Sequence, residues 1–181
     1  MSQLFADCLG EIFEYLEEDG ETLRSCLLVN RLWCEVSVGI LWRRIRNYST
    51  LIACLPNESK EILYKDGIIT STLTSKPPMF NYATFCKVLS IRQVDVNIMQ
   101  LLKNQQSAKN QQSQSLNLLG TVRQEVLKLL MSQTSLRKLT FSQLLYPSLN
   151  IFPITSFPGA KDCLKNLSEF HCDSDIYPAT F

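Results

Sequence analysis

The sequence predicts a mainly α-helical fold with some β-structure, in two parts that meet near residue 46. Within the first 46 residues, apolar residues recur at helical spacing in three short runs, which are separated by residues that end helices. Beyond residue 47, helical runs alternate with short β-branched or leucine-containing runs that are typical of strands. We therefore expect a small helical domain over residues 1–46 and a larger α/β region over residues 47–181.

The first helix is predicted over residues 6–18. Its residues Leu9, Ile12, Phe13 and Leu16 follow the spacing i, i+3, i+4 and i+7, which places them on one stripe. The sequence EEDG at 17–20 ends the helix, since Gly20 can adopt the left-handed conformation common at helix ends.

Two further short helices complete this domain. The second is predicted from Thr22 to Val29, where Asn30 serves as a break or a cap, because its side chain can bond neighbouring backbone groups. The third runs from Arg31 to Val38 and is interrupted by Gly39.

The region after residue 47 contains helices and one short strand. A helix with Asn57 as N-cap ends at Gly67, a strand covers Val88 to Ile91, and helical runs follow at 95–104 and 118–130. Residues 103–117 are almost wholly polar, and either a flexible loop or an exposed extension of the flanking helices explains them.

Leucine-containing units mark the last third of the chain. LRKLTF at 136–141 and LKNLSEFHC at 164–172 each have leucines three residues apart, and FCKVLSI at 85–91 is a candidate third unit. Such spacing is typical of leucine-rich repeats, in which the leucines line a narrow core beside a short strand. The units are irregularly spaced, and we expect Leu136, Leu139, Leu164 and Leu167 in a shared core. Arg137, Lys138, Lys165 and Asn166 should lie outside this core, free to meet a partner.

Composition limits the classes of partner. The chain has 181 residues, 45% of them hydrophobic, and a formal net charge of +1, which provides no global field for nucleic acid or an acidic membrane. Its seven cysteines are scattered, without a CxxC pair, as expected of reduced thiols in a cytoplasmic or nuclear protein. The acidic N-terminal stretch does not resemble a signal peptide, and no run is apolar enough to span a membrane.

The first 45 residues resemble an F-box in the order, spacing and type of their apolar residues. The matching positions are Leu4, Leu9, the pair Ile12 and Phe13, Leu16, the stretch LRSCLLVNRLW with Val29, Arg31 and Trp33, and the pair Leu41 and Trp42. Phe5 stands where the family has proline, and Asn30 stands where it usually has cysteine. The remainder resembles the irregular leucine-rich repeats often attached to F-boxes, especially in large fungal families.

This resemblance implies a non-catalytic substrate receptor of a ubiquitin ligase. The F-box would bind a Skp adaptor and, through it, a cullin, while the repeat region would begin a solenoid that holds an unknown protein substrate. The resemblance places adaptor binding on Leu4, Phe5, Leu9, Ile12, Phe13, Leu16, Leu27, Val29, Arg31, Trp33 and Trp42. No catalytic, cofactor-binding or metal-binding residue is implied.

Each feature has a plainer interpretation. The apolar stripe and the tryptophans could be ordinary core, although a unit of 45 residues is too small to hide so many apolar groups alone. Arg24, Arg31, Arg43, Arg44 and Arg46 could belong to a helical nucleic-acid-binding regulator, or to a solvated edge facing the acidic first helix. The neighbours His171 and Cys172 would point to opposite faces of a strand, so they do not form a catalytic pair.

Overall fold

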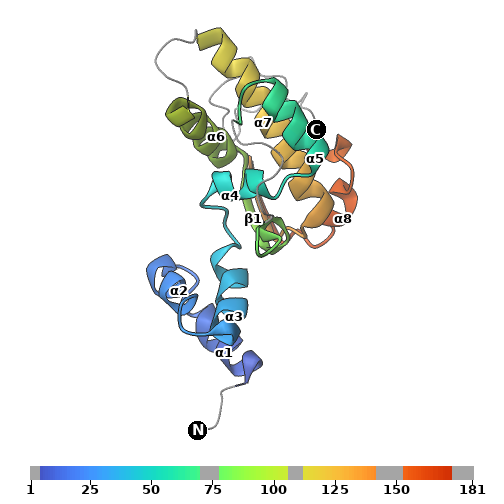
Figure 1. Ribbon diagram of the computed structural model, residues 1–181. Coiled ribbons are helices and arrows are strands. Elements are labelled where there is room, and N and C mark those ends of the chain that lie inside the picture. The colour runs from blue at the N-terminus through green and yellow to red at the C-terminus, as the bar shows by residue number, and fades with distance from the viewer. Residues whose placement is uncertain (1–4, 70–77, 106–111, 142–152, 173–181) are drawn as a thin grey trace. The chain divides into compact units, whose positions relative to one another are not determined.

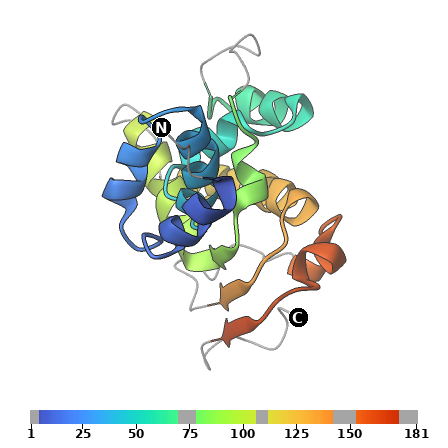
Figure 2. The same cartoon turned by 90° about the horizontal axis from the view of Figure 1, so that it is seen from below.

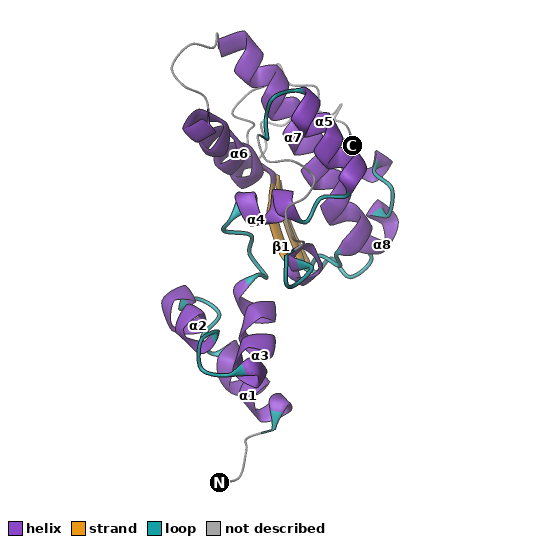
Figure 3. Ribbon diagram, viewed as in Figure 1, coloured by secondary structure: helices purple, strands orange, loops and turns teal. Residues whose placement is uncertain are grey.

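A computed structural model describes residues 5–69, 78–105, 112–141 and 153–172. The chain divides into two compact units, Met1–Arg44 and Ile45–Phe181, here called unit 1 and unit 2. In the described part of the chain, helices dominate both units and three short strands lie in unit 2, so the fold is mainly α with some β (Figure 3). Among the described residues, no helix is long and apolar enough to cross a membrane.

Unit 1 consists of α1 (Ala6–Glu14), α2 (Gly20–Cys26) and α3 (Arg31–Leu41). Two side-chain caps separate them. The Asp19 carboxylate accepts a hydrogen bond from the Thr22 backbone N–H at 3.0 Å, and the Asn30 side-chain oxygen accepts one from the Trp33 N–H at 3.0 Å. The prediction that Asn30 caps a helix is thus confirmed.

The first helix is shorter than predicted, because α1 ends at Glu14 and a turn follows. Gly20 was expected to end α1 in the left-handed conformation, and this is wrong: Gly20 is the first residue of α2, and Gly67 and Gly159 are the described residues with positive φ. The physical reason is the carboxylate of Asp19, which caps α2 so that this helix begins at Gly20, two residues before the predicted Thr22, and no left-handed residue is required.

Gly39 does not interrupt the third helix as predicted, since α3 continues through it to Leu41. A helical glycine costs about 1 kcal/mol relative to alanine. The burial of Ile40 in the next position offsets that cost. The core of unit 1 consists of Leu9, Phe13, Leu23, Cys26 and Ile40, with Leu16, Leu32, Trp33, Val36 and Leu41 packed against it.

Unit 2 contains five α-helices within its described residues. They are α4 (Tyr48–Ala53), α5 (Asn57–Lys65), α6 (Ile91–Gln105), α7 (Gln112–Gln133) and α8 (Ala160–Leu164), with 3₁₀ turns at Tyr82–Phe85 and Ile154–Ser156 (Figure 1). The sequence reading did not identify α4, whose N-cap is Asn47.

Gly67 ends α5 as predicted, with a φ of 69°. The Ile68 N–H donates to the Leu63 carbonyl at 2.8 Å, and the Gly67 N–H donates to the Tyr64 carbonyl at 3.0 Å, which is the Schellman arrangement. At the other end the prediction was wrong, because Pro56 occupies the N-cap position and Asn57 is already helical without a side-chain cap. Proline fixes its own φ there, so the helix can begin without that cap.

The sheet of unit 2 has three parallel strands in the order β1 (Val88–Ser90), β2 (Lys138–Phe141) and β3 (Glu169–Cys172), seen side by side in Figure 2. Leu89, Leu139 and Phe170 share one register row. The predicted strand at 88–91 is confirmed except for Ile91, which begins α6. Helix α6 packs against β1 and β2.

The register corrects the alignment of the leucine-containing units. Leu139 pairs with Phe170, so the last leucine-containing unit begins at Leu167 and reads LSEFHC at 167–172. It does not begin at Leu164, as the sequence LKNLSEFHC predicted. With this shift the three units become CKVLSI, LRKLTF and LSEFHC, each with apolar or sulfur side chains at its first, fourth and sixth positions. Leu136 and Leu139 are buried as expected, whereas Leu164 lies at the end of α8 and, like Leu167, is only half-buried.

Two of the four residues expected to be free for a partner contact side chains of another segment of unit 2. The Lys138 ammonium lies 2.7 Å from the carboxylate of Glu169, its register neighbour on β3, and the Asn166 amide donates to the Ser135 hydroxyl at 3.0 Å. The parallel pairing of β2 and β3 places Lys138 beside Glu169, which the sequence of either segment alone does not reveal. Arg137 and Lys165 are exposed.

Both flanking helices extend into the polar segment at 103–117. Helix α6 reaches Gln105 and α7 begins at Gln112, while residues 106–111 lie outside the described residues. The interpretation as helix extensions therefore holds for the described part of this segment, and the loop interpretation is wrong there. Side chains that face solvent on a helix need not be apolar, so composition alone did not separate the two.

Candidate functional site

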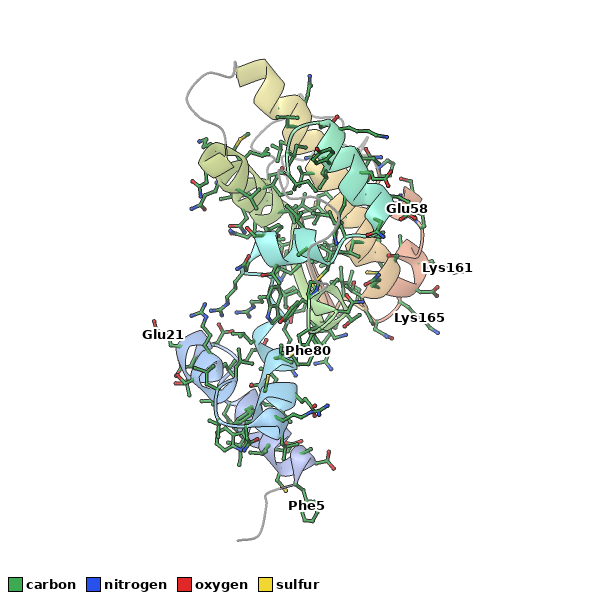
Figure 4. The ribbon with its side chains drawn as sticks, in the orientation of Figure 1. Phe5, Glu21, Glu58, Phe80, Lys161 and Lys165 are labelled. Atoms are coloured by element: carbon green, nitrogen blue, oxygen red, sulfur yellow. The ribbon has the colours of Figure 1, made fainter. Side chains whose placement is uncertain are left out.

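Unit 1 exposes several large apolar side chains although its core is small. Phe5 is 79% exposed, Ile12 51% and Tyr15 92% along α1, and Leu28 is 87% and Val29 55% exposed between α2 and α3. Phe5 projects away from the first turn of α1 (Figure 4). A soluble protein rarely leaves so many large apolar groups this close in sequence to water without a partner.

The exposed residues of α1 form a second stripe beside the buried one. Phe5, Cys8, Ile12 and Tyr15 follow the spacing i, i+3, i+7 and i+10 and are all exposed, which places them along one side of the helix. We call this set the α1 stripe. The sequence reading grouped Ile12 with Leu9, Phe13 and Leu16, but Leu9 and Phe13 are buried and Leu16 is packed against the core.

Beneath the α1 stripe, aromatic packing holds α1 on α3. The rings of Phe13 and Trp33 meet edge to face with centroids 5.1 Å apart. Trp33 is half-buried and packs against the core, whereas Phe13 is fully buried within it. The position of Trp33 is fixed a second time, because its backbone N–H donates a hydrogen bond to the Asn30 side-chain oxygen.

The other expected adaptor residues are distributed around unit 1. Leu27 is the half-buried C-cap of α2, Trp42 is the half-buried C-cap of α3, and Arg31 is exposed with its guanidinium 2.8 Å from Glu35. Leu4 lies outside the described residues. Tyr15, Cys8 and Leu28 were missed by the sequence reading, although continuing the period from Phe5 and Ile12 would have found the first two.

Arginines at the end of α3 are engaged with the acidic first helix. Arg43 forms a two-pronged ion pair with Glu14 and a second contact with Glu17 at 3.1 Å, while Arg44 lies 2.7 Å from Glu18. The hydrogen bonds that the Arg43 guanidinium donates to Glu14 raise the pKa of Arg43 above its usual value. This arrangement matches the predicted edge facing α1 and leaves these cations with carboxylates instead of phosphates.

The charge at the start of α2 is also fixed locally. The Asp19 carboxylate accepts hydrogen bonds from the hydroxyl and the backbone N–H of Thr22, and these bonds lower the pKa of Asp19. Within the described residues, no group of three or more His, Cys, Asp or Glu residues is arranged to hold a metal ion.

Comparisons with known proteins give no further guide, because no family model, curated protein or solved structure matches this chain.

Proposed function

We propose that unit 1 is an F-box-type module that binds a Skp adaptor, and that the chain is a non-catalytic substrate receptor of a Skp–cullin ubiquitin ligase. The observation that carries this proposal is the α1 stripe, an exposed apolar surface on a three-helix unit whose sequence resembles an F-box. Aromatic side chains such as Phe5 and Tyr15 are typical anchors of protein interfaces.

The division of labour within α1 supports the proposal. Leu9 and Phe13 build the core that gives the helix its orientation, and Phe5, Ile12 and Tyr15 remain available for an adaptor. Burying these three in an interface would remove large apolar areas from water, which is the main favourable term in such associations. The receptor's contribution to catalysis would be positional, since it holds a substrate near the ubiquitin donor.

The nucleic-acid alternative has less support. Arg43 and Arg44 are engaged by Glu14, Glu17 and Glu18, and the net charge of the chain is +1. Binding that depends on phosphate contacts would fall steeply with salt, whereas a mainly apolar interface would not.

The decisive experiment uses the full chain co-expressed with a Skp adaptor and analysed by size exclusion. We expect a complex that Ile12→Asp and Tyr15→Asp each abolish at micromolar concentration, because a carboxylate would be buried without a partner. Ala6→Asp is the matched control. It adds the same charge to α1 at an exposed position off the stripe, where an acid suits the start of a helix.

Circular dichroism must show that the variants fold, which the exposure of Ile12 and Tyr15 predicts. Separate elution of the wild-type chain and the adaptor would refute the proposed function. Complexes of unchanged stability with both stripe variants would remove the α1 stripe from the interface.

A further inference from the structure

Unit 2 has an open groove of about 320 Å³ between the start of α4 and one face of α6. The two helices are neighbours in the structure (Figure 1). The lining residues are Arg46, Asn47, Tyr48 and Ser49 from the α4 side and Asn97, Gln100, Leu101 and Asn104 from α6. The α6 set follows the spacing i, i+3, i+4 and i+7, so three carboxamides face the groove from a single side of the helix.

One part of the groove is held rigid by its own hydrogen bonds. The buried Tyr48 hydroxyl is hydrogen-bonded to the Asn97 side chain, and burial raises the pKa of Tyr48, so this hydroxyl stays neutral. Asn47 is occupied as the N-cap of α4, where it accepts the Thr50 N–H at 3.0 Å. Tyr48 and Asn97 therefore form a fixed floor.

The other charged and carboxamide side chains of the lining have no partner among the described residues. Arg46, Gln100 and Asn104 are exposed, and their side chains form no hydrogen bond or ion pair with another described residue. The lining residues include one guanidinium and no carboxylate, so the groove favours an anion. Each carboxamide both donates and accepts, as a peptide group does, so Gln100 and Asn104 can pair with a peptide backbone.

The dimensions match a short extended peptide. With a helical rise of 1.5 Å per residue, Asn97 to Asn104 covers about 10 Å. An extended chain advances about 3.3 Å per residue, so this face of α6 is as long as about three peptide residues. A volume of about 320 Å³ is at the small end of ligand sites, as expected for a few residues and not for a folded domain.

We propose that this groove binds an extended acidic peptide segment, whose backbone pairs with Gln100 and Asn104 and whose carboxylate pairs with Arg46. The inference rests on the groove alone and not on adaptor binding by unit 1. If the chain is a substrate receptor, the segment belongs to the substrate, and an acidic sequence would be part of what unit 2 selects.

The test uses the full-length chain without adaptor and three pools of fluorescein-labelled six-residue peptides, amidated at the C-terminus. The pools differ only at the two central positions, which are Glu, Gln or Lys. Fluorescence anisotropy should show the Glu pool binding about tenfold more tightly than the Gln pool, since a charge-assisted hydrogen bond is gained. The Lys pool should bind most weakly.

Variants assign the contacts. Arg46→Glu should abolish the preference for the Glu pool, whereas Arg92→Glu should keep it, because Arg92 is an exposed α6 residue outside the groove. The double change Gln100→Ala and Asn104→Ala should weaken binding of the Glu and Gln pools alike. In NMR spectra, the side-chain NH₂ signals of Gln100 and Asn104 should shift when the Glu pool is added.

Three outcomes would overturn the proposal. They are equal affinity for the Glu and Lys pools, identical behaviour of Arg46→Glu and Arg92→Glu, and binding of the Glu pool that inorganic phosphate abolishes while the amide signals stay unchanged. The last result would mean simple anion binding. None of these measurements involves the adaptor, so their failure is distinguishable from failure of the α1 stripe.

Discussion

Units 1 and 2 solve the problem of covering apolar surface in different ways. Unit 1 has 44 residues and unit 2 has 137, yet each has five large apolar side chains that are exposed among its described residues. Three short helices enclose a core of five buried residues in unit 1, and the stripe next to it stays in water. A small unit cannot cover its own apolar faces, which is why its surface and not its interior suggests the function.

Unit 2 buries charge as well as apolar area. Asp95 of α6 and Arg123 of α7 are both buried, with the Arg123 guanidinium 3.3 Å from the Asp95 carboxylate. Ser59 of α5 donates a hydrogen bond to the buried Glu125 of α7. Such pairs require an interior that is large enough to hold them with their partners, so they tie the stability of unit 2 to its tertiary packing.

The largest expected effect is from breaking the buried pair. Asp95→Ala should lower the free energy of unfolding of unit 2 by about 3–5 kcal/mol, because the buried Arg123 guanidinium loses a hydrogen-bond acceptor that a carboxyl group provides in either protonation state and alanine does not. Both tryptophans lie in unit 1, so tryptophan fluorescence reports unit 1 and far-ultraviolet circular dichroism reports both units. We expect urea to shift the dichroism transition alone. A parallel shift in fluorescence would mean that the two units unfold together.

The same pair gives unit 2 a pH dependence whose sign is fixed. Burial raises the pKa of Asp95 above its usual value, although Arg123 opposes the shift. The folded state therefore binds this proton more tightly than the unfolded state, so protonation of Asp95 stabilises unit 2. This stabilisation is lost as the pH rises through the raised pKa. The stability of the wild type relative to Asp95→Asn should increase as the pH falls below neutral. Urea titrations that show a constant difference would exclude this role.

The next effect tests the register of the repeats. Leu136→Ala should cost unit 2 about 2–5 kcal/mol, since Leu136 is fully buried beside the central strand. Leu164→Ala should cost less than half as much, because Leu164 is half-buried at the end of α8. Equal losses in urea denaturation would restore the alignment in which Leu164 is a repeat position.

A smaller effect is expected from removing the Asn30 cap of α3 in unit 1. Asn30→Ala should destabilise unit 1 by about 1 kcal/mol, since it removes the bond to the Trp33 N–H. Asn57→Ala in unit 2 is the matched control and should change stability by no more than about 0.5 kcal/mol, because Asn57 makes no cap. Fluorescence and dichroism transitions report the two changes separately. A larger loss for Asn57→Ala would show that the sequence had identified the right cap.

The smallest expected effect concerns the entry into α1. Phe5 has a φ of −68°, which is the value that a proline ring imposes, so Phe5→Pro should stabilise unit 1 by about 0.4–1 kcal/mol through the unfolded state. If the ring of Phe5 belongs to the interface, the same variant should bind the adaptor more weakly. A variant that is more stable and binds equally well would show that the Phe5 ring is not part of the adaptor interface.

Local chemistry in the sequence predicted much of the secondary structure. The Asn30 cap, the stop at Gly67 and the strand near Val88 are each specified by a few neighbouring residues, and the structure confirms all three. The wrong predictions at Gly20, Gly39 and Asn57 also have local causes. The Asp19 cap makes Gly20 the first residue of α2, and the burial of Ile40 favours a helix that continues through position 39. Pro56, whose φ is fixed by its ring, takes the N-cap position that was expected for Asn57.

The division of apolar residues between core and surface was decided by the tertiary structure. The sequence by itself determined that α1 would be amphipathic and that unit 2 would contain leucine-containing strands, since periodicity depends only on spacing along the chain. Three features depend on contacts between segments that are far apart in sequence. They are the side of α1 that faces α3, the pairing of Leu139 with Phe170, and the groove that Arg46 shares with Gln100. The physical reason is that burial and pairing are properties of neighbours in space, which no spacing along one segment can specify.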